Sequence, residues 1–90
     1  MKVLFEHNDH QIILTRGVVT SELTIDAALA DTWNGFTNNQ TKAFTLSGMA
    51  VNADGTKDPV KVTVNPSLFH DDVELYYGGT LIETKKVSMF

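Results

Sequence analysis

The chain has 90 residues, of which 42% are hydrophobic and 20% charged; its formal net charge is −4 and it contains no cysteine. These values predict one globular domain over residues 1–90 and argue against a disordered or multidomain protein. The lack of cysteine excludes disulfides and thiolate zinc sites, and the seven scattered Lys and Arg residues argue against a nucleic-acid partner.

The sequence also bears on location and on support for the fold. Met1–His7 reaches charged residues before any long apolar run, so we expect no signal peptide and synthesis in the cytoplasm. No stretch approaches the roughly 20 apolar residues of a membrane span. A domain of this size buries only about 60–65% of its unfolded surface. Without disulfides, its stability is expected to depend on a partner subunit or a larger assembly.

The first half of the chain predicts strands and one helix. Val3–Phe5 and Ile12–Leu14 flank the polar segment His7–His10, which favours a hairpin. Val18–Ile25 alternates apolar and polar residues, as a strand with one solvated face does. A helix is expected next, because one apolar stripe has helical spacing and several alanines accompany it. The stripe consists of Ile25, Ala28, Leu29 and Trp33. The alternative is a type I′ turn at Asn34-Gly35.

The second half predicts strands throughout. In Ala43–Val51 the alternation changes phase at Gly48, which suggests a β-bulge. Val60–Val64 alternates cleanly. Gly78-Gly79 separates Val73–Tyr77 from Thr80–Thr84 and predicts a tight hairpin. We find no internal repeat in the sequence. The expected fold is mainly β: a small antiparallel β sandwich or partly open barrel of six to seven strands with one short α-helix.

Three polar clusters are candidates for sites of chemistry. His7, Asp9 and His10 have a spacing that supplies metal ligands, with a polar hairpin loop as the simpler interpretation. His70-Asp71-Asp72 joins an imidazole to two carboxylates but lacks the context of a nucleophile. Asn52–Asp58 resembles an oxygen-rich calcium loop only in part, since Lys61 falls where the EF-hand pattern needs glutamate. We therefore predict no catalytic residue, no metal and no cofactor.

A register argument adds one carboxylate pair and two tyrosines. If Gly78-Gly79 form the turn, Glu74 lies opposite Glu83, where two like charges oppose each other. Tyr76 and Tyr77 then point to opposite faces, so at most one belongs to the core. Tyrosine suits interfaces because it combines apolar area with a polar tip. The expected interface residues are Tyr76, Tyr77, Val87, Met89 and Phe90, the last three because the chain ends in apolar residues.

From these features we predict a non-enzymatic structural or binding module. It is expected to be an accessory subunit of a larger assembly or a homo-oligomer, with a protein partner or itself as the binding partner. A phage virion, with the chain as capsid decoration or tail subunit, is the kind of assembly considered. The alternatives are a small acidic inhibitor or adaptor that docks on one macromolecule, and, with less support, a metal-dependent small enzyme.

Overall fold

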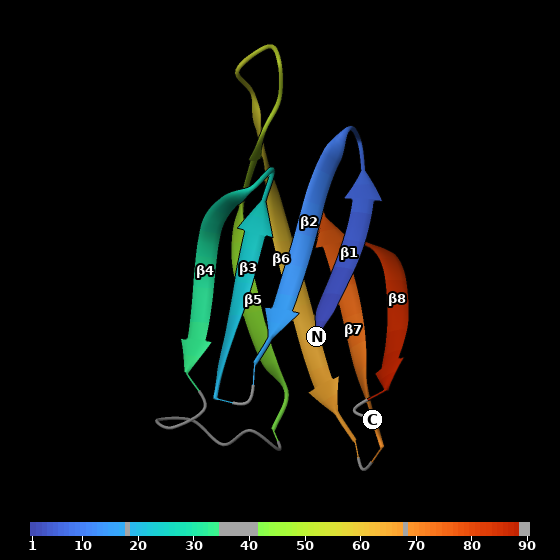
Figure 1. The fold of residues 1–90 in the computed structure, drawn as a ribbon. Helices are drawn as coiled ribbons and strands as arrows, with labels where there is room; N and C mark the ends of the chain where they lie inside the picture. The colour runs from blue at the N-terminus through green and yellow to red at the C-terminus, as the bar shows by residue number, and fades with distance from the viewer. Residues whose placement is uncertain (18, 35–41, 68, 89–90) are drawn as a thin grey trace.

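Two four-stranded antiparallel sheets pack face to face in a computed structural model that describes residues 1–17, 19–34, 42–67 and 69–88 (Figure 1). The first sheet comprises β1 (Lys2–His7), β2 (His10–Arg16), β3 (Thr20–Ile25) and β4 (Ala28–Asn34). The second comprises β5 (Phe44–Val51), β6 (Lys57–Pro66), β7 (His70–Tyr77) and β8 (Thr80–Ser88). In both sheets the spatial order follows the chain order. The mainly β, sandwich-like prediction is confirmed, with eight strands in the described part of the chain rather than six to seven.

The core lies between the sheets and is formed by alternate residues of six strands. The buried hydrophobic side chains are Val3, Phe5, Ile12, Leu14, Leu23, Ile25, Phe44, Leu46, Ala50, Val60, Val62, Val64, Val73, Leu75 and Tyr77. The edge strands β4 and β8 contribute no fully buried residue, and only Trp33 and Val87 pack against the core from them. The strands with strict alternation therefore form the core, and β4 and β8 cover its margins.

The predicted helix is wrong: the described residues form no α-helix, and Ile25–Trp33 is a β-hairpin. Asp26 and Ala27 have φ values of 50° and 68°, which make a two-residue turn between β3 and β4. A helix over this segment would have buried Leu29, which is 60% exposed instead. Pairing with β3 outweighs the helix propensity of the alanines. The alternative turn at Asn34-Gly35 requires Gly35, which lies outside the described residues.

The β-bulge expected at Gly48 is also absent. β5 pairs with β6 in unbroken register from Phe44 to Val51, so Met49 and Val51 point outward from the sandwich. Gly48 faces inward, where an added Cβ would lie 2.7 Å from the Cβ of Ala30 and 2.9 Å from Cδ1 of Ile25. The glycine therefore permits the close approach of β4 to β5 and does not mark a change of phase.

The two hairpins predicted from turn residues are confirmed. Asn8 and Asp9 join β1 to β2 with φ values of 52° and 65°, and Gly78 and Gly79 join β7 to β8 with 61° and 84°. Tyr77 and Tyr76 pair with Thr80 and Leu81 as predicted. From Leu75 to the start of β7 the register differs from the prediction, because β8 has a bulge at this point.

The bulge corrects the predicted pairing of two carboxylates. Glu83 lies opposite Leu75, and Glu74 lies opposite Thr84. The expected Glu74–Glu83 pair is therefore not formed. Glu74 accepts a hydrogen bond from Nδ2 of Asn65 at 2.8 Å.

The two sheets are structural repeats of each other. The connection between β2 and β3 is closed by a hydrogen bond from Gly17 N to Thr20 O (2.8 Å), and that between β6 and β7 by one from Ser67 N to His70 O (2.9 Å). These positions are fifty residues apart, and the flanking strands pair in the same register. The halves share geometry without the sequence likeness that would have revealed a repeat.

Within the described residues there is no helix long and apolar enough to cross a bilayer.

Candidate functional site

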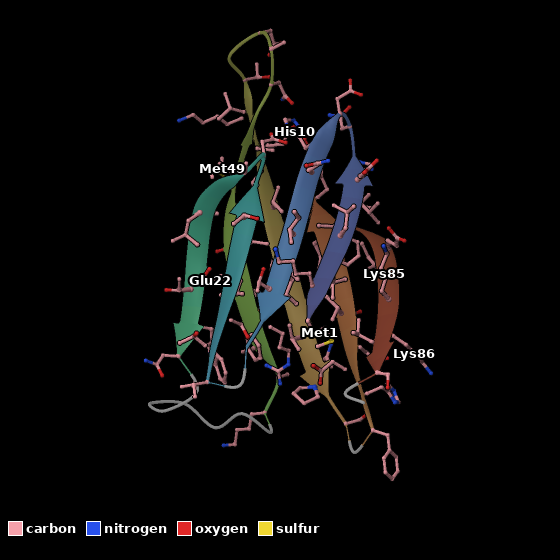
Figure 2. The ribbon with its side chains drawn as sticks, in the orientation of Figure 1. Met1, His10, Glu22, Met49, Lys85 and Lys86 are labelled. Atoms are coloured by element: carbon pink, nitrogen blue, oxygen red, sulfur yellow. The ribbon has the colours of Figure 1, made fainter. Side chains whose placement is uncertain are left out.

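Two features of the surface are candidates for function: a polar network at one end of the sandwich and an apolar area on the outer face of the second sheet. The network lies where the β1–β2 turn, the β3–β4 turn and the β5–β6 loop meet, at the upper end in Figure 1. His10 is at its centre (Figure 2). A depression of about 570 Å³, lined by Asn8, Asp9, His10, Asp26, Val51, Asn52, Ala53, Asp54 and Thr56, opens beside it.

Both ring nitrogens of His10 are hydrogen-bonded to protein oxygens. Nδ1 lies 2.6 Å from Oδ2 of Asp26, and Nε2 lies 2.8 Å from Oδ1 of Asn52. The bonds to Asn52 and then to Asp26 raise the pKa of His10. The bond from His10 lowers the pKa of Asp26, and the backbone N–H of Gln11 lowers it further. The His10 side chain is 7% exposed. His10 thereby links the β3–β4 turn of the first sheet, through Asp26, to the β5–β6 loop of the second sheet, through Asn52.

The network continues through Asp58 to Tyr77. Oδ2 of Asp58 accepts hydrogen bonds from Nδ2 of Asn52 (3.0 Å) and from the hydroxyl of Tyr77 (2.9 Å). These two bonds lower the pKa of Asp58. The ring of Tyr77 stacks near His10 and meets the ring of His7 edge-on, with centroids 4.7 Å apart. Tyr77 is thus the core tyrosine of the predicted pair, and its hydroxyl stabilises the end of the sandwich.

The polar residues considered as metal or catalytic clusters are not brought together as sites. His10 uses both nitrogens within the protein, His7 packs on Tyr77, and Asp9 is exposed in its turn. In the β5–β6 loop, Asp54 accepts hydrogen bonds from Thr56. Among residues 1–17, 19–34, 42–67 and 69–88, no group of three or more His, Cys, Asp or Glu side chains is placed to hold a metal ion.

The cluster His70-Asp71-Asp72 is divided between two faces. Asp71 points inward, is completely buried and pairs with the Nε of Arg16 at 2.5 Å. His70 and Asp72 remain half-exposed, with their side chains 3.6 Å apart. The alternation of β7 separates the imidazole from Asp71, so the three residues do not form one site.

The outer face of the second sheet carries a connected apolar area around Tyr76. We call Met49, Pro59, Lys61, Tyr76 and Leu81 the Tyr76 surface. Met49 pairs with Pro59, and Tyr76 lies between Lys61 and Leu81 in the sheet. Met49 is 50% exposed and Leu81 47%. Beside Tyr76 the surface forms a shallow hollow of about 370 Å³.

Lys61 is the charged member of the Tyr76 surface. Its Nζ lies 4.5 Å from the centroid of the Tyr76 ring, a distance typical of a cation–π contact. The hollow is lined by Ser47, Gly48, Met49, Pro59, Val60, Lys61, Tyr76 and Gly79.

Of the five expected interface residues, Tyr76 is partly exposed on the outer face, while Tyr77 is buried. Val87 is half-buried, pairs with Asp71 and packs against the core. Met89 and Phe90 lie outside the described residues. Sequence analysis missed Met49, because its parity was attributed to a bulge, and missed Asp26 and Asn52, which only the fold brings to His10.

Comparison of the chain with protein-family models, with curated proteins and with solved structures found no match. The function must therefore be inferred from the chain's own residues.

Proposed function

We propose that the chain is a non-enzymatic binding module that acts as an accessory subunit of a larger assembly and docks through the Tyr76 surface. The observation that carries the proposal is the cluster of exposed Met49, Pro59 and Leu81 around a partly exposed tyrosine on one sheet face. Tyrosine and methionine are enriched at the centres of protein interfaces, whereas a strand facing only water is normally polar on that side.

The composition of the same face supports docking at this place. Below the Tyr76 surface, the outer positions of the second sheet are polar: Thr45 bonds Thr63 through their hydroxyls, and Glu74 bonds Asn65. The apolar residues are thus gathered at one end of the face and bordered by polar ones, which is the usual anatomy of an interface core and its rim. A phage virion remains the kind of assembly considered, on the size and composition of the chain.

The acidic inhibitor or adaptor is the second candidate. It is favoured by the carboxylates Asp9, Asp26 and Asp54 around the depression beside His10. A docking site there would be recognised by a basic partner through electrostatic complementarity. The two candidates place the contact on different parts of the molecule, so one set of variants separates them.

The experiment compares three variants with the unaltered chain. The first is Met49→Thr with Tyr76→Thr and Leu81→Thr, which makes the Tyr76 surface polar. The control is Leu4→Thr with Leu29→Thr, which removes exposed apolar residues from the first sheet. The third, Asp9→Asn with Asp54→Asn, removes charge from the depression. Native mass is measured by sedimentation velocity of the purified chains and by size-exclusion chromatography of extracts of the natural source.

The proposal expects a complex that the first variant weakens at least tenfold and the control leaves intact. Loss of the complex in the third variant alone would instead support the inhibitor or adaptor. A chain that sediments and elutes as a free monomer in every sample would contradict the assembly subunit.

A further inference from the structure

We infer that His10 is a doubly protonated clamp between the two sheets, and that its deprotonation releases the β5–β6 loop from the β3–β4 turn. The inference concerns the polar network and is independent of the Tyr76 surface. It follows from the directions of the hydrogen bonds around the imidazole.

The orientation of the Asn52 side chain is fixed by its other partners. Its Nδ2 donates to Oδ2 of Asp58, which has no proton to give, and to Oγ1 of Thr56, each at 3.0 Å. The Thr56 hydroxyl donates its own proton to Oδ1 of Asp54 at 2.6 Å. Reversing the amide would turn Oδ1 toward the Asp58 carboxylate. The oxygen of Asn52 therefore faces His10 and can only accept.

Asp26 imposes the same requirement on the other side of the ring. Its Oδ1 accepts from the Gln11 backbone N–H at 2.9 Å, and its Oδ2 faces Nδ1 of His10 at 2.6 Å. His10 thus lies between two acceptors and satisfies both only with a proton on each nitrogen. A neutral imidazole would leave one nitrogen lone pair facing an acceptor oxygen, on a side chain that is itself buried.

The charged groups around the ring favour the cation. Asp26 on the β3–β4 turn contacts it directly, and Asp58 on β6 follows through Asn52. Asp54 on the β5–β6 loop and Asp9 on the β1–β2 turn line the adjoining depression.

Two further titratable groups lie near His10. The Tyr77 hydroxyl is neutral and donates to Asp58, and His7 lies beyond the tyrosine ring. Carboxylates therefore dominate the electrostatic environment, and the single positive charge of His10 joins acidic segments of both sheets.

The proton has a mechanical consequence. His10 is bonded to Asn52 at the start of the loop, and the same loop is closed by hydrogen bonds from Asn52 N to Thr56 O and from Gly55 N to Asn52 O. Nδ1 faces a carboxylate and Nε2 a neutral amide oxygen, so the proton on Nε2 is the one lost. Its loss removes the bond from His10 to Asn52 that joins the two sheets. The loop then opens locally while the core strands remain paired, because its residues Ala53–Thr56 are exposed.

The test is NMR of the full chain as a function of pH. The ring of His10 should titrate with a midpoint above 6.5, and both ring nitrogens should carry a proton below that midpoint. Asp26→Asn should lower that midpoint by on the order of one pH unit, because a charge partner is lost. The matched control is Asp9→Asn, an exposed neighbour that makes no bond to His10, which should leave the midpoint within a few tenths of a unit.

Amide hydrogen exchange provides the second readout. Protection of the Gly55 amide should fall as pH rises through the His10 midpoint, and His10→Gln should show low protection at every pH. A His10 midpoint at or below 6.5 overturns the inference. Gly55 protection that stays constant through the titration does so as well, and the Asp26→Asn series decides the matter if His10→Gln does not fold.

Discussion

Asp31 on β4 and Lys85 on β8 occupy equivalent positions in the two halves of the molecule, and each reaches across to the other sheet. Asp31 lies opposite Leu23 and Lys85 lies opposite Val73, two buried residues fifty positions apart in the repeated geometry. One equivalent residue is an acid and the other a base.

The two side chains bind backbone groups of opposite kind. Oδ2 of Asp31 accepts from the backbone N–H of Ser47 on β5 at 3.0 Å, while Nζ of Lys85 donates to the backbone carbonyl of Leu4 on β1 at 2.5 Å. β1 and β5 are edge strands of their sheets. Inward-pointing charges and bulges are known means of preventing strands from other chains from adding to an edge, and β4 and β8 have both.

We therefore predict that removing these charges promotes edge-to-edge association more than it destabilises the fold. Asp31→Ala and Lys85→Ala should each cost at most about 1 kcal/mol of unfolding free energy, because both pairs are partly exposed. Light scattering at increasing concentration should nonetheless show larger species. The exposed neighbours Thr32→Ala and Lys86→Ala are the controls. Equal scattering by all four variants would show that the two charges do not guard the edges.

The buried pair Arg16–Asp71 gives a second prediction. Asp71 is completely buried, and its equivalent in the first half is Ser21, which is also buried but uncharged. Arg16→Leu would leave the carboxylate without its partner, at a cost of about 3–5 kcal/mol. Adding Asp71→Ser places at position 71 the residue type that the first sheet has at Ser21, and it should recover most of the lost free energy of unfolding. Urea unfolding of the single and double variants measures this, and a double variant no more stable than Arg16→Leu would contradict it.

The sequence predicted the elements whose signals are local. Gly78-Gly79 and Asn8-Asp9 supply positive φ by residue type, and strands such as β6 alternate strictly, so these features were predicted correctly. Ala28–Trp33 was not, because its alanines favour a helix and its place at the edge of a sheet is decided by pairing with β3. β4 has no fully buried residue, and so its apolar pattern says little about its conformation.

The candidate sites depend on contacts between distant residues. His10 was recognised as notable, but its partners Asp26 and Asn52 lie 16 and 42 residues away, and no spacing rule connects them. Met49 was assigned to the wrong face because it is apolar and yet points outward, which alternation alone interprets as a bulge at Gly48. The true role of Gly48 is to allow the close approach of β4 to β5, and this contact is not visible in the sequence.

The pKa shifts predict how stability depends on pH. The pKa of His10 is raised from 6.5, so its contribution is complete below 6.5 and is lost as pH rises through the raised value. The pKa values of Asp26 and Asp58 are lowered from 3.8, so their contributions are present above 3.8 and are lost as pH falls through the lowered values. Urea midpoints should therefore be highest between 3.8 and 6.5, and His10→Gln should abolish the decline on the alkaline side. An unchanged alkaline decline in that variant would assign it to another group.

The last prediction compares two equivalent turns with different residues. Ala27 has a φ of 68° and Gly79 a φ of 84°, and each is the second residue of a two-residue hairpin turn. A side chain at positive φ is strained by about 1–2 kcal/mol, whereas glycine is not. Ala27→Gly should therefore stabilise the chain by roughly 0.5–1 kcal/mol, since part of the gain offsets the greater freedom of the unfolded glycine. Gly79→Ala should destabilise it by a similar amount, although an added Cβ there meets nothing within 4 Å.

Thermal and urea unfolding measure the stability of both variants. The control is Ala28→Gly on the adjoining strand, which should destabilise the chain because the backbone at Ala28 is extended. If Ala27→Gly were as destabilising as Ala28→Gly, the β3–β4 connection would not be a turn with positive φ at Ala27.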